Sequence, residues 1–387
     1  MENNNMIYLD NSAGSHPKPP AVAAAMAAAI NEYGANPGRG NYAMSRRTSA
    51  FVEKAREKLA DFFHLADPRQ VIFTAGATMS LNMGLRGLLS DGKKLLLCGM
   101  EHNALSRPAA AMSDSGMISV CQLFADPCGN YRLADIASKL ACGDISLMAV
   151  THGSNVNGAV VDLPAIAALA RKSHTPLLLD AAQTGGLLPL DMRKLPRCAV
   201  SIAGHKGLFG PAGIGVLLVQ GLELQPLLLG GTGIRSEERL MPRENPEHLE
   251  AGSINVAGIA GLMAGLDFVE QTGIEQIYDH SCRLTRRLAE MAGNIAGMEL
   301  YLPAGGVQLP VLALNIKGLD PAEVAAWLDS RYGVCVRSGY HCAPAAHRAL
   351  GTMEAGSVRF SPSWFNTMED IEHTARALEE IARGRRR

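Results

Sequence analysis

A lysine that ends an apolar run is the residue of this sequence best suited to covalent chemistry. The run 198–203 is followed at once by Gly204, His205 and Lys206. This pattern predicts a buried strand that releases the lysine at its carboxyl end. Poor hydration there would lower the pKa of the ammonium group, and the resulting free amine can form a Schiff base. The alternative interpretation is a solvated surface lysine, whose stem alone is covered.

Polar side chains follow three further apolar runs. Asp180 ends the run Leu177-Leu178-Leu179, 26 residues before Lys206. A carboxylate at that position would keep a pyridine nitrogen protonated, whereas the alternative role is that of a helix cap. His102 follows the run 94–98 and could stack on a flat cofactor, and Asn155 follows the run 146–151. The carboxyl ends of parallel strands meet at one sheet edge, so we expect one common site.

Composition limits the class of protein. The chain has 387 residues, 47% of them hydrophobic and 19% charged, which predicts a globular protein of two domains. A net charge of −1 favours neither nucleic acid nor an anionic membrane as a partner. The eight cysteines form no CxxC pair, and we find no signal segment and no apolar run of membrane-spanning length. We therefore expect a reduced, cytoplasmic protein.

Alternating strands and helices predict an α/β fold with a mostly parallel sheet. A small-residue turn at 75–78 opens a helix whose free N–H groups suit a phosphate. The strands are expected at 7–11, 71–74, 94–98, 146–151, 177–180 and 199–203, with an antiparallel edge at 213–219. The helices are expected at 20–33, 49–63, 103–115, 131–141 and 162–173. Beyond a polar surface excursion at 235–250, helices are expected at 255–270, 274–292, 321–331 and 368–382, and strands at 310–316 and 334–337.

An ordered set of short motifs identifies a family resemblance. The motifs are EHN at 101, SNVNG at 154, LLLDAAQ at 177, AGHKGLFGPAGIG at 203, EAGS at 250 and RSGYHCAP at 337. Together they resemble the class V aminotransferases, which are pyridoxal-phosphate (PLP) enzymes, and within that family the cysteine desulfurase and selenocysteine lyase branch. The resemblance implies PLP-dependent fold type I. It divides the chain into a large PLP-binding domain at 15–255 with a seven-stranded sheet and a small C-terminal α/β domain at 256–387, near which segment 1–14 packs.

The resemblance also implies roles for individual residues. Lys206 would hold PLP covalently and His102 would stack on the ring. Arg359 would clamp the substrate carboxylate, since a guanidinium binds a carboxylate through two parallel hydrogen bonds. The remaining expected cofactor contacts are Asp180 at the pyridine nitrogen, Gln183 and Asn155 near the ring oxygen and substrate, Ala77, Thr78 and His205 at the phosphate, and Ser253 at the phosphate of a second subunit in a homodimer.

One position departs from the family pattern. Where the family usually has Ser or Thr three residues before the lysine, this chain has Ala203. The loss of one hydroxyl donor to a dianion costs about 1.5–3 kcal/mol if nothing replaces it. We therefore expect looser PLP binding, or compensation by Ser201 or a water molecule.

Cys342 decides between activities within the branch. Arg337 and His341 are expected to supply positive charge that favours a thiolate. A thiolate could take sulfur from L-cysteine, giving L-alanine and a Cys342 persulfide for an acceptor protein. His102 would assist Lys206 in proton transfer. A metal site built from Cys335, His341, Cys342 and His347 lacks the usual paired spacing, so no metal is predicted.

Two other functions remain open from the sequence. A selenocysteine lyase would release selenium without needing the thiol. A PLP-binding sulfur-relay scaffold of low turnover would agree with Ala203, although the set Lys206, Asp180, His102 and Arg359 favours an enzyme. Transamination and cystine lysis would leave Cys342 without a function.

Overall fold

A seven-stranded sheet forms the centre of the larger part of the molecule in the computed structural model, which describes residues 6–38, 40–195 and 197–384. The strand order is β2-β8-β7-β6-β5-β3-β4, and every strand except β8 runs in the same direction. The strands are β2 (Val71–Thr74), β3 (Lys93–Cys98), β4 (Ile118–Leu123), β5 (Leu147–Thr151), β6 (Leu177–Asp180), β7 (Cys198–Ala203) and β8 (Gly215–Gln220). The predicted mostly parallel α/β fold is confirmed.

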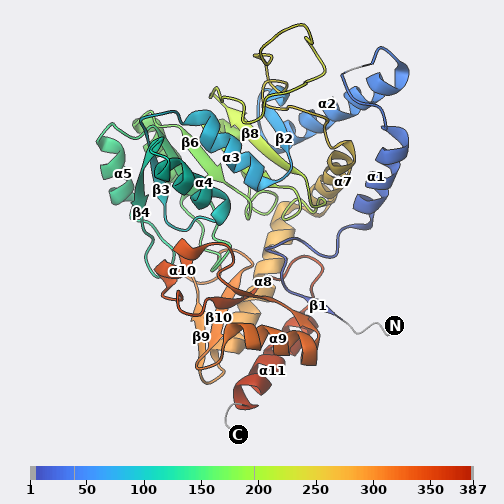
Figure 1. Ribbon diagram of the computed structural model, residues 1–387. Helices are drawn as coiled ribbons and strands as arrows, with labels where there is room; N and C mark the ends of the chain where they lie inside the picture. Colours follow the sequence, from blue (N-terminus) through green and yellow to red (C-terminus); the bar gives the residue numbers. More distant parts are fainter. Residues whose placement is uncertain (1–5, 39, 196, 385–387) are drawn as a thin grey trace.

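Helices cover both faces of this sheet and make three layers (Figure 1). One face carries α3 (Ala77–Leu88) and α4 (Asn103–Asp114). The other face carries α2 (Ala43–Phe63), α5 (Leu133–Ala141), α6 (Leu163–Lys172) and α7 (Val256–Thr272), and α1 (Pro20–Glu32) packs on α7. The central strands β5, β6 and β7 are buried along their whole length, as apolar strands covered on both faces must be.

The structure corrects two expectations about the sheet. The segment expected as an antiparallel edge is β8, which is antiparallel but lies between β7 and β2, inside the sheet. The edge strand β4 has an exposed or half-buried side chain at five of its six positions and was not predicted. Its sequence ISVCQL lacks the continuous apolar run that reveals the buried strands.

The C-terminal part contains a four-stranded antiparallel sheet in the order β12-β13-β10-β9. The strands are β9 (Met298–Tyr301), β10 (Leu312–Ile316), β12 (Arg337–Gly339) and β13 (Ser357–Phe360), and the helices are α8 (Ile274–Gly293), α9 (Pro321–Tyr332), α10 (Pro344–Leu350) and α11 (Met368–Gly384). Near the N-terminus β1 (Ile7–Tyr8) pairs in parallel with β11 (Val334–Cys335). We propose the boundaries 15–255 and 256–387 for the two domains, although α7, which begins the second range, packs on the large sheet. Of the segment 1–14, residues 1–5 lie outside the described residues.

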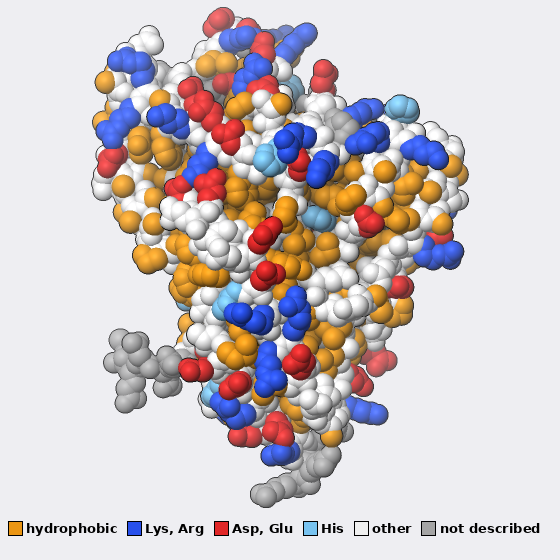
Figure 2. All heavy atoms as spheres, turned by 180° about the vertical axis from the view of Figure 1, so that it is seen from behind, with side chains coloured by type: hydrophobic (Ala, Val, Ile, Leu, Met, Phe, Trp, Pro, Cys, Tyr) orange, Lys and Arg blue, Asp and Glu red, His pale blue; other side chains and the backbone are white. Residues whose placement is uncertain are grey.

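The surface mixes both signs of charge. On the face in Figure 2, Lys and Arg side chains lie among Asp and Glu side chains, with hydrophobic side chains between them. Several large hydrophobic side chains are exposed on the loop that follows β8, Leu228, Leu229 and Leu240. Within the described residues no helix is long and apolar enough to cross a membrane.

Candidate active site

The carboxyl ends of β3, β5, β6 and β7 surround a cavity of about 570 Å³, here called the strand-end cavity. It collects side chains from across the sequence because parallel strands deliver their following residues to one edge. The predicted residues that line it are Ala77, Thr78, His102, Asn155, Asp180, Gln183, His205, Lys206 and Arg359. Two predicted residues, Ser253 and Cys342, are not part of its lining.

Lys206 and Asp180 face this cavity from neighbouring strand ends. Burial lowers the pKa of Lys206 to about 8, and the nearby Arg359 and Arg337 add to this effect while Asp180 opposes it. Burial raises the pKa of Asp180, whereas a hydrogen bond from the Ala182 backbone N–H (3.0 Å) and the charge of Lys206 favour its ionised form. A lysine of this kind offers a substantial fraction of free amine near neutral pH.

Two of the three histidines that line the cavity, His102 and His205, have pKa values that keep them neutral at neutral pH. Burial and the cations Lys206, Arg337 and Arg359 lower the pKa of His102 to about 4. His102 is also the N-cap of α4, and its Nδ1 accepts a hydrogen bond from the Ala104 backbone N–H (3.0 Å). Its proton must therefore be on Nε2. Burial likewise lowers the pKa of His205 to about 4.

The first turn of α3 makes a cradle for an anion. Gly76 precedes it with φ 142°, and Ala77 and Thr78 begin the helix with free backbone N–H groups. The cradle lies tightly against the sheet, because a Cβ on Gly215 of β8 would lie 2.6 Å from the Gly76 Cα. Ala203 lines the same cavity and brings no donor. The Ser201 hydroxyl donates to the Ala77 carbonyl (3.2 Å) and so supports the cradle from behind.

Arg359 forms the cationic end of the cavity. Its side chain is 1% exposed, forms an ion pair with Asp10, and donates from Nη1 to the Asn155 backbone carbonyl (3.1 Å). Arg337 lies beside it, because these two residues are register partners on β12 and β13. The two guanidinium groups suit a substrate that carries a carboxylate.

Cys342 lies on the loop between β12 and α10, directly after His341, which lines the strand-end cavity. Its Sγ is 3.7 Å from Arg337 Nη2, and it is half-buried. The expectation that His341 adds positive charge is wrong. Burial and the nearby Arg359 lower the pKa of His341 to about 2, so its ring is neutral. Arg337 is the nearby cation, because a guanidinium keeps its charge when partly buried.

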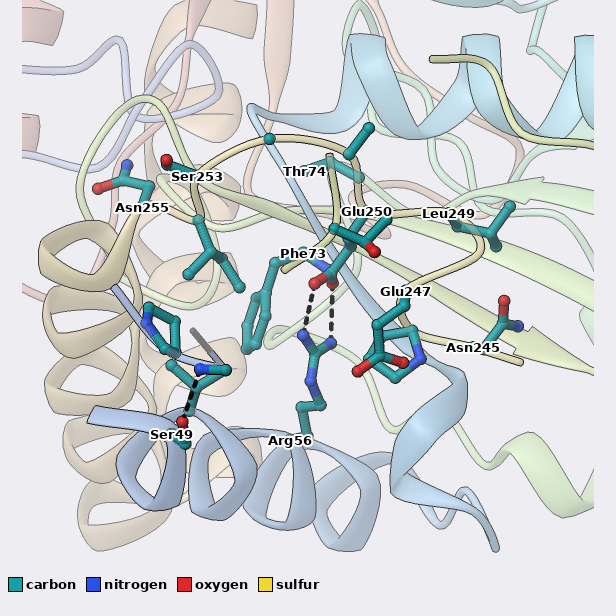
Figure 3. Close-up of a pocket in the computed structure, with 18 of the residues that line it drawn as sticks. Ser49, Arg56, Phe73, Thr74, Asn245, Glu247, Leu249, Glu250, Ser253 and Asn255 are labelled. Carbon is teal, nitrogen blue, oxygen red and sulfur yellow. Dashed lines mark hydrogen bonds and ion pairs between the residues drawn. The ribbon is translucent and has the colours of Figure 1, made fainter. Parts of the chain in front are cut away.

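Ser253 lies in a second cavity of about 820 Å³ (Figure 3). This cavity adjoins the first one, since Ala75 and Met79 line both. Its wall holds an ion pair between Arg56 and Glu250, with Nη2 and Oε2 2.5 Å apart, and Glu250 also accepts the Phe73 backbone N–H (2.6 Å). Glu250 was expected in a polar surface excursion, but this pairing holds it against the sheet.

The cavity fits a flat, phosphate-bearing cofactor such as PLP. Five buried polar atoms of its lining have no partner within the described chain: Thr151 Oγ1, Asn155 Oδ1, His205 Nδ1, His341 Nδ1 and Arg359 Nε. A buried polar group without a partner is rare in a native protein unless a ligand or water satisfies it. The anion cradle, the amine and the buried carboxylate face the same space as these atoms. Among the described residues, no group of three or more His, Cys, Asp or Glu is arranged to hold a metal ion.

Two residues of the site were given no role from the sequence. Asp10 pairs with Arg359, and Thr151 presents a free hydroxyl. Arg337 was expected only near Cys342, and the structure shows that it also lines the cavity. Thr151 is the last residue of a predicted strand, and this position could have indicated that its side chain lies at the site. Nothing in the local sequence around Asp10 indicates that it pairs with a residue from the far end of the chain.

Comparisons with known proteins agree along nearly the whole chain. The family model described as Aminotransferase class-V matches residues 7–374. A probable cysteine desulfurase of Methanothermobacter thermautotrophicus is 35% identical, over 97% of this chain and 94% of that protein. A cysteine desulfurase of Salmonella agona is 31% identical, over 98% and 94%. The solved apo structure of the cysteine desulfurase from Thermococcus onnurineus superposes with a TM-score of 0.90 at 30% identity, covering 98% of this chain and 96% of that one.

Proposed function

Because this chain belongs to the class V aminotransferase family, we propose that it is a PLP-dependent cysteine desulfurase that leaves a persulfide on Cys342. The observation that carries this proposal is that Cys342 lies beside His341 and Arg337, which line the cavity that also contains Lys206, Asp180 and Arg359. An ordinary aminotransferase needs no thiol there. The solved relatives have PLP-dependent fold type I, and this chain shares that fold.

We assign PLP to the strand-end cavity. Lys206 would hold it covalently, Asp180 would pair with its ring nitrogen, and the cradle at Ala77 and Thr78 would bind its phosphate. His102 would lie on the ring, with Gln183 and Asn155 near the ring oxygen and His205 near the phosphate. When bound, PLP supplies an electron sink that makes the substrate α-proton and the Cβ–S bond labile.

The protein's own residues then bind the substrate and move its protons. Arg359 binds the α-carboxylate, with Asn155 beside it. Lys206, once free, takes the α-proton at Nζ, and its lowered pKa places it near the pH at which it can both accept and release a proton. His102 can donate from Nε2, because its Nδ1 is occupied by the Ala104 N–H.

Cys342 carries out the sulfur transfer. Its Sγ forms an S–S bond with the substrate sulfur as the Cβ–S bond breaks, and the carbon skeleton keeps that electron pair and is protonated. L-cysteine and one thiol thus give L-alanine and one persulfide, a balanced reaction without an added oxidant or reductant. Arg337 stabilises the attacking thiolate from 3.7 Å. The half-buried position of Cys342 leaves the persulfide accessible to an acceptor protein.

A homodimer would explain the position of Ser253. Ser253 lines the second cavity and not the strand-end cavity of the same chain. The two cavities adjoin at Ala75 and Met79. The exposed Leu228, Leu229 and Leu240 offer apolar surface on the nearby loop. We propose that a second copy covers this surface and that Ser253 binds the phosphate of the cofactor in that copy.

All eight cysteines lie in the described part of the chain and are free, which supports a reducing, cytoplasmic location.

The deciding measurement is alanine formed from L-cysteine and from L-selenocysteine by wild type and by Cys342→Ala. We expect the variant to lose only the cysteine reaction. Equal alanine from cysteine in both proteins would exclude the persulfide mechanism. If selenocysteine is the better substrate by far and wild type forms little persulfide, the selenocysteine lyase is the correct assignment. Negligible turnover of both substrates by the holoenzyme would instead support the sulfur-relay scaffold.

A further inference from the structure

The loop that carries Cys342 has an unusual backbone. His341 and Cys342 both adopt the left-handed conformation, with φ of 48° and 57°. For residues other than glycine this conformation is unfavourable, and it persists only where the surrounding structure enforces it. The two residues are the central positions of a turn that the Ala343 N–H closes on the Tyr340 carbonyl (2.8 Å), and contacts from outside the loop hold this turn in place.

Two hydrogen bonds from residues that follow strands of the large sheet hold His341 and Cys342. The Asn155 side chain donates from Nδ2 to the His341 carbonyl (2.7 Å), and the Asn103 backbone N–H donates to the Cys342 carbonyl (2.6 Å). These carbonyls belong to the peptide groups immediately before and after the Cys342 Cα. When both peptide planes are fixed, the direction of the Cα–Cβ bond is fixed too.

The neighbouring neutral ring supports the same arrangement. The His341 ring is buried, and its Nε2 lies 3.1 Å from the Ser357 carbonyl and 3.2 Å from the Ser357 hydroxyl on β13. The loop is thus attached to β13 on one side and to the segments after β3 and β5 on the other.

The two donors also belong to the segments that carry the chemistry. Asn103 directly follows His102, and the Asn155 backbone carbonyl accepts a hydrogen bond from Arg359. The thiol is therefore held relative to the proposed ring-stacking histidine and the proposed carboxylate-binding arginine.

We propose that Asn103 and Asn155 are positioning residues that hold Cys342 at the angle needed for attack on the substrate sulfur. The inference rests on the proposed desulfurase function. Beyond that function, it gives the Asn103 backbone N–H and the Asn155 side-chain amide the role of positioning the thiol. A small misplacement of a reacting group slows a reaction about a hundredfold, so loss of one of these bonds should be visible in the cysteine reaction.

Asn103→Pro tests the backbone bond with little disturbance of the helix. Asn103 is the first residue of α4, where proline is well tolerated, and His102 before it already has the extended backbone (φ −71°, ψ 153°) that a proline requires. Proline removes the N–H that binds Cys342. Asn103→Ala is the matched control, because it loses the same side chain and keeps the N–H.

The first readout is alkylation of Cys342 by iodoacetamide in the holoenzyme, followed by mass spectrometry of the peptide that contains it. We expect Asn103→Pro to be alkylated at least threefold faster than Asn103→Ala. The second readout compares substrates. We expect alanine formation from L-cysteine to fall about tenfold to a hundredfold in Asn103→Pro, with L-selenocysteine lysis within twofold of the control.

Equal alkylation rates in the two variants, or equal loss of the cysteine and selenocysteine reactions, would overturn the proposal. If Asn103→Pro does not fold, Asn155→Ala replaces it in the alkylation assay, with the same threefold criterion against wild type. The alkylation contrast does not depend on turnover. It therefore tests the loop even if the Cys342→Ala experiment rejects the desulfurase function.

Discussion

The guanidinium of Arg359 forms an ion pair with the carboxylate of Asp10, 349 positions away in the sequence. Asp10 forms an isolated parallel bridge with Ser361, the residue after β13, so a segment near the N-terminus completes the cationic end of the cavity. The charge of the buried Arg359 is thus compensated before a substrate arrives. A substrate carboxylate has to share this guanidinium with Asp10 or replace it.

Asp10→Asn should destabilise the protein and make a carboxylate ligand more stabilising. A hydrogen bond to a charged group contributes about 1.5–3 kcal/mol to the free energy of unfolding, and the variant leaves Arg359 uncompensated. Urea denaturation measures the loss. In thermal unfolding, L-alanine should raise the Tm of the variant more than that of wild type. Equal shifts in both proteins would mean that Asp10 and the ligand do not compete for Arg359.

Covalent capture of PLP by the apoprotein should depend on pH through Lys206. Its pKa of about 8 lies below the usual 10.5, so the reactive free amine increases as the pH rises from 6 to 9, with a midpoint near 8. The rate of the absorbance change on mixing with PLP measures this. Asp180→Asn removes the charge that raises this pKa, so its midpoint should be lower. Lys206→Ala is the control for capture at Lys18, whose pKa is also lowered to about 8 by burial. A midpoint near 10 would contradict the buried environment of Lys206.

Ala203→Ser should tighten PLP binding. Ala203 lines the cavity, and the Ser201 hydroxyl is already used at the Ala77 carbonyl, so a new hydroxyl at 203 would add a donor that the site lacks. A hydrogen bond to a dianion contributes about 1.5–3 kcal/mol, which lowers the Kd about tenfold or more. Equilibrium dialysis of the apoprotein measures the Kd. Ala203→Cys is the control, since a thiol is a weak donor of similar size. An unchanged Kd for Ala203→Ser would show that another group already satisfies the phosphate.

The Arg56–Glu250 ion pair should show strong coupling in stability. Both side chains are largely buried, 8% and 15% exposed, and Glu250 also accepts the Phe73 N–H. Arg56→Leu leaves a buried carboxylate unpaired and should lower the free energy of unfolding by about 3 kcal/mol or more. Arg56→Leu combined with Glu250→Gln should recover part of this loss, because the neutral amide can still accept the Phe73 N–H. Additive effects of the two substitutions in urea denaturation would show that the pair is not coupled.

Much of the fold, and most of the side chains that line the strand-end cavity, follow from local sequence. The apolar runs that end in Asp180 and Lys206 must be buried strands, and parallel strands bring their carboxyl ends together. From that rule alone, the sequence predicts that Lys206, Asp180, His102 and Asn155 lie at one cavity. The amphipathic strand β4 could not be found in this way, because its edge position leaves most of its side chains partly exposed.

Long-range contacts decided the rest. Arg359 and Asp10, Asn155 and His341, and Asn103 and Cys342 are each joined by a hydrogen bond that no local pattern encodes. Burial also decided the charge of His341. The sequence places an imidazole beside the thiol, but only the surrounding protein shows that desolvation and Arg359 keep it neutral. Local sequence determines which groups reach the sheet edge, whereas the packing of the C-terminal sheet against that edge decides their charge and their orientation.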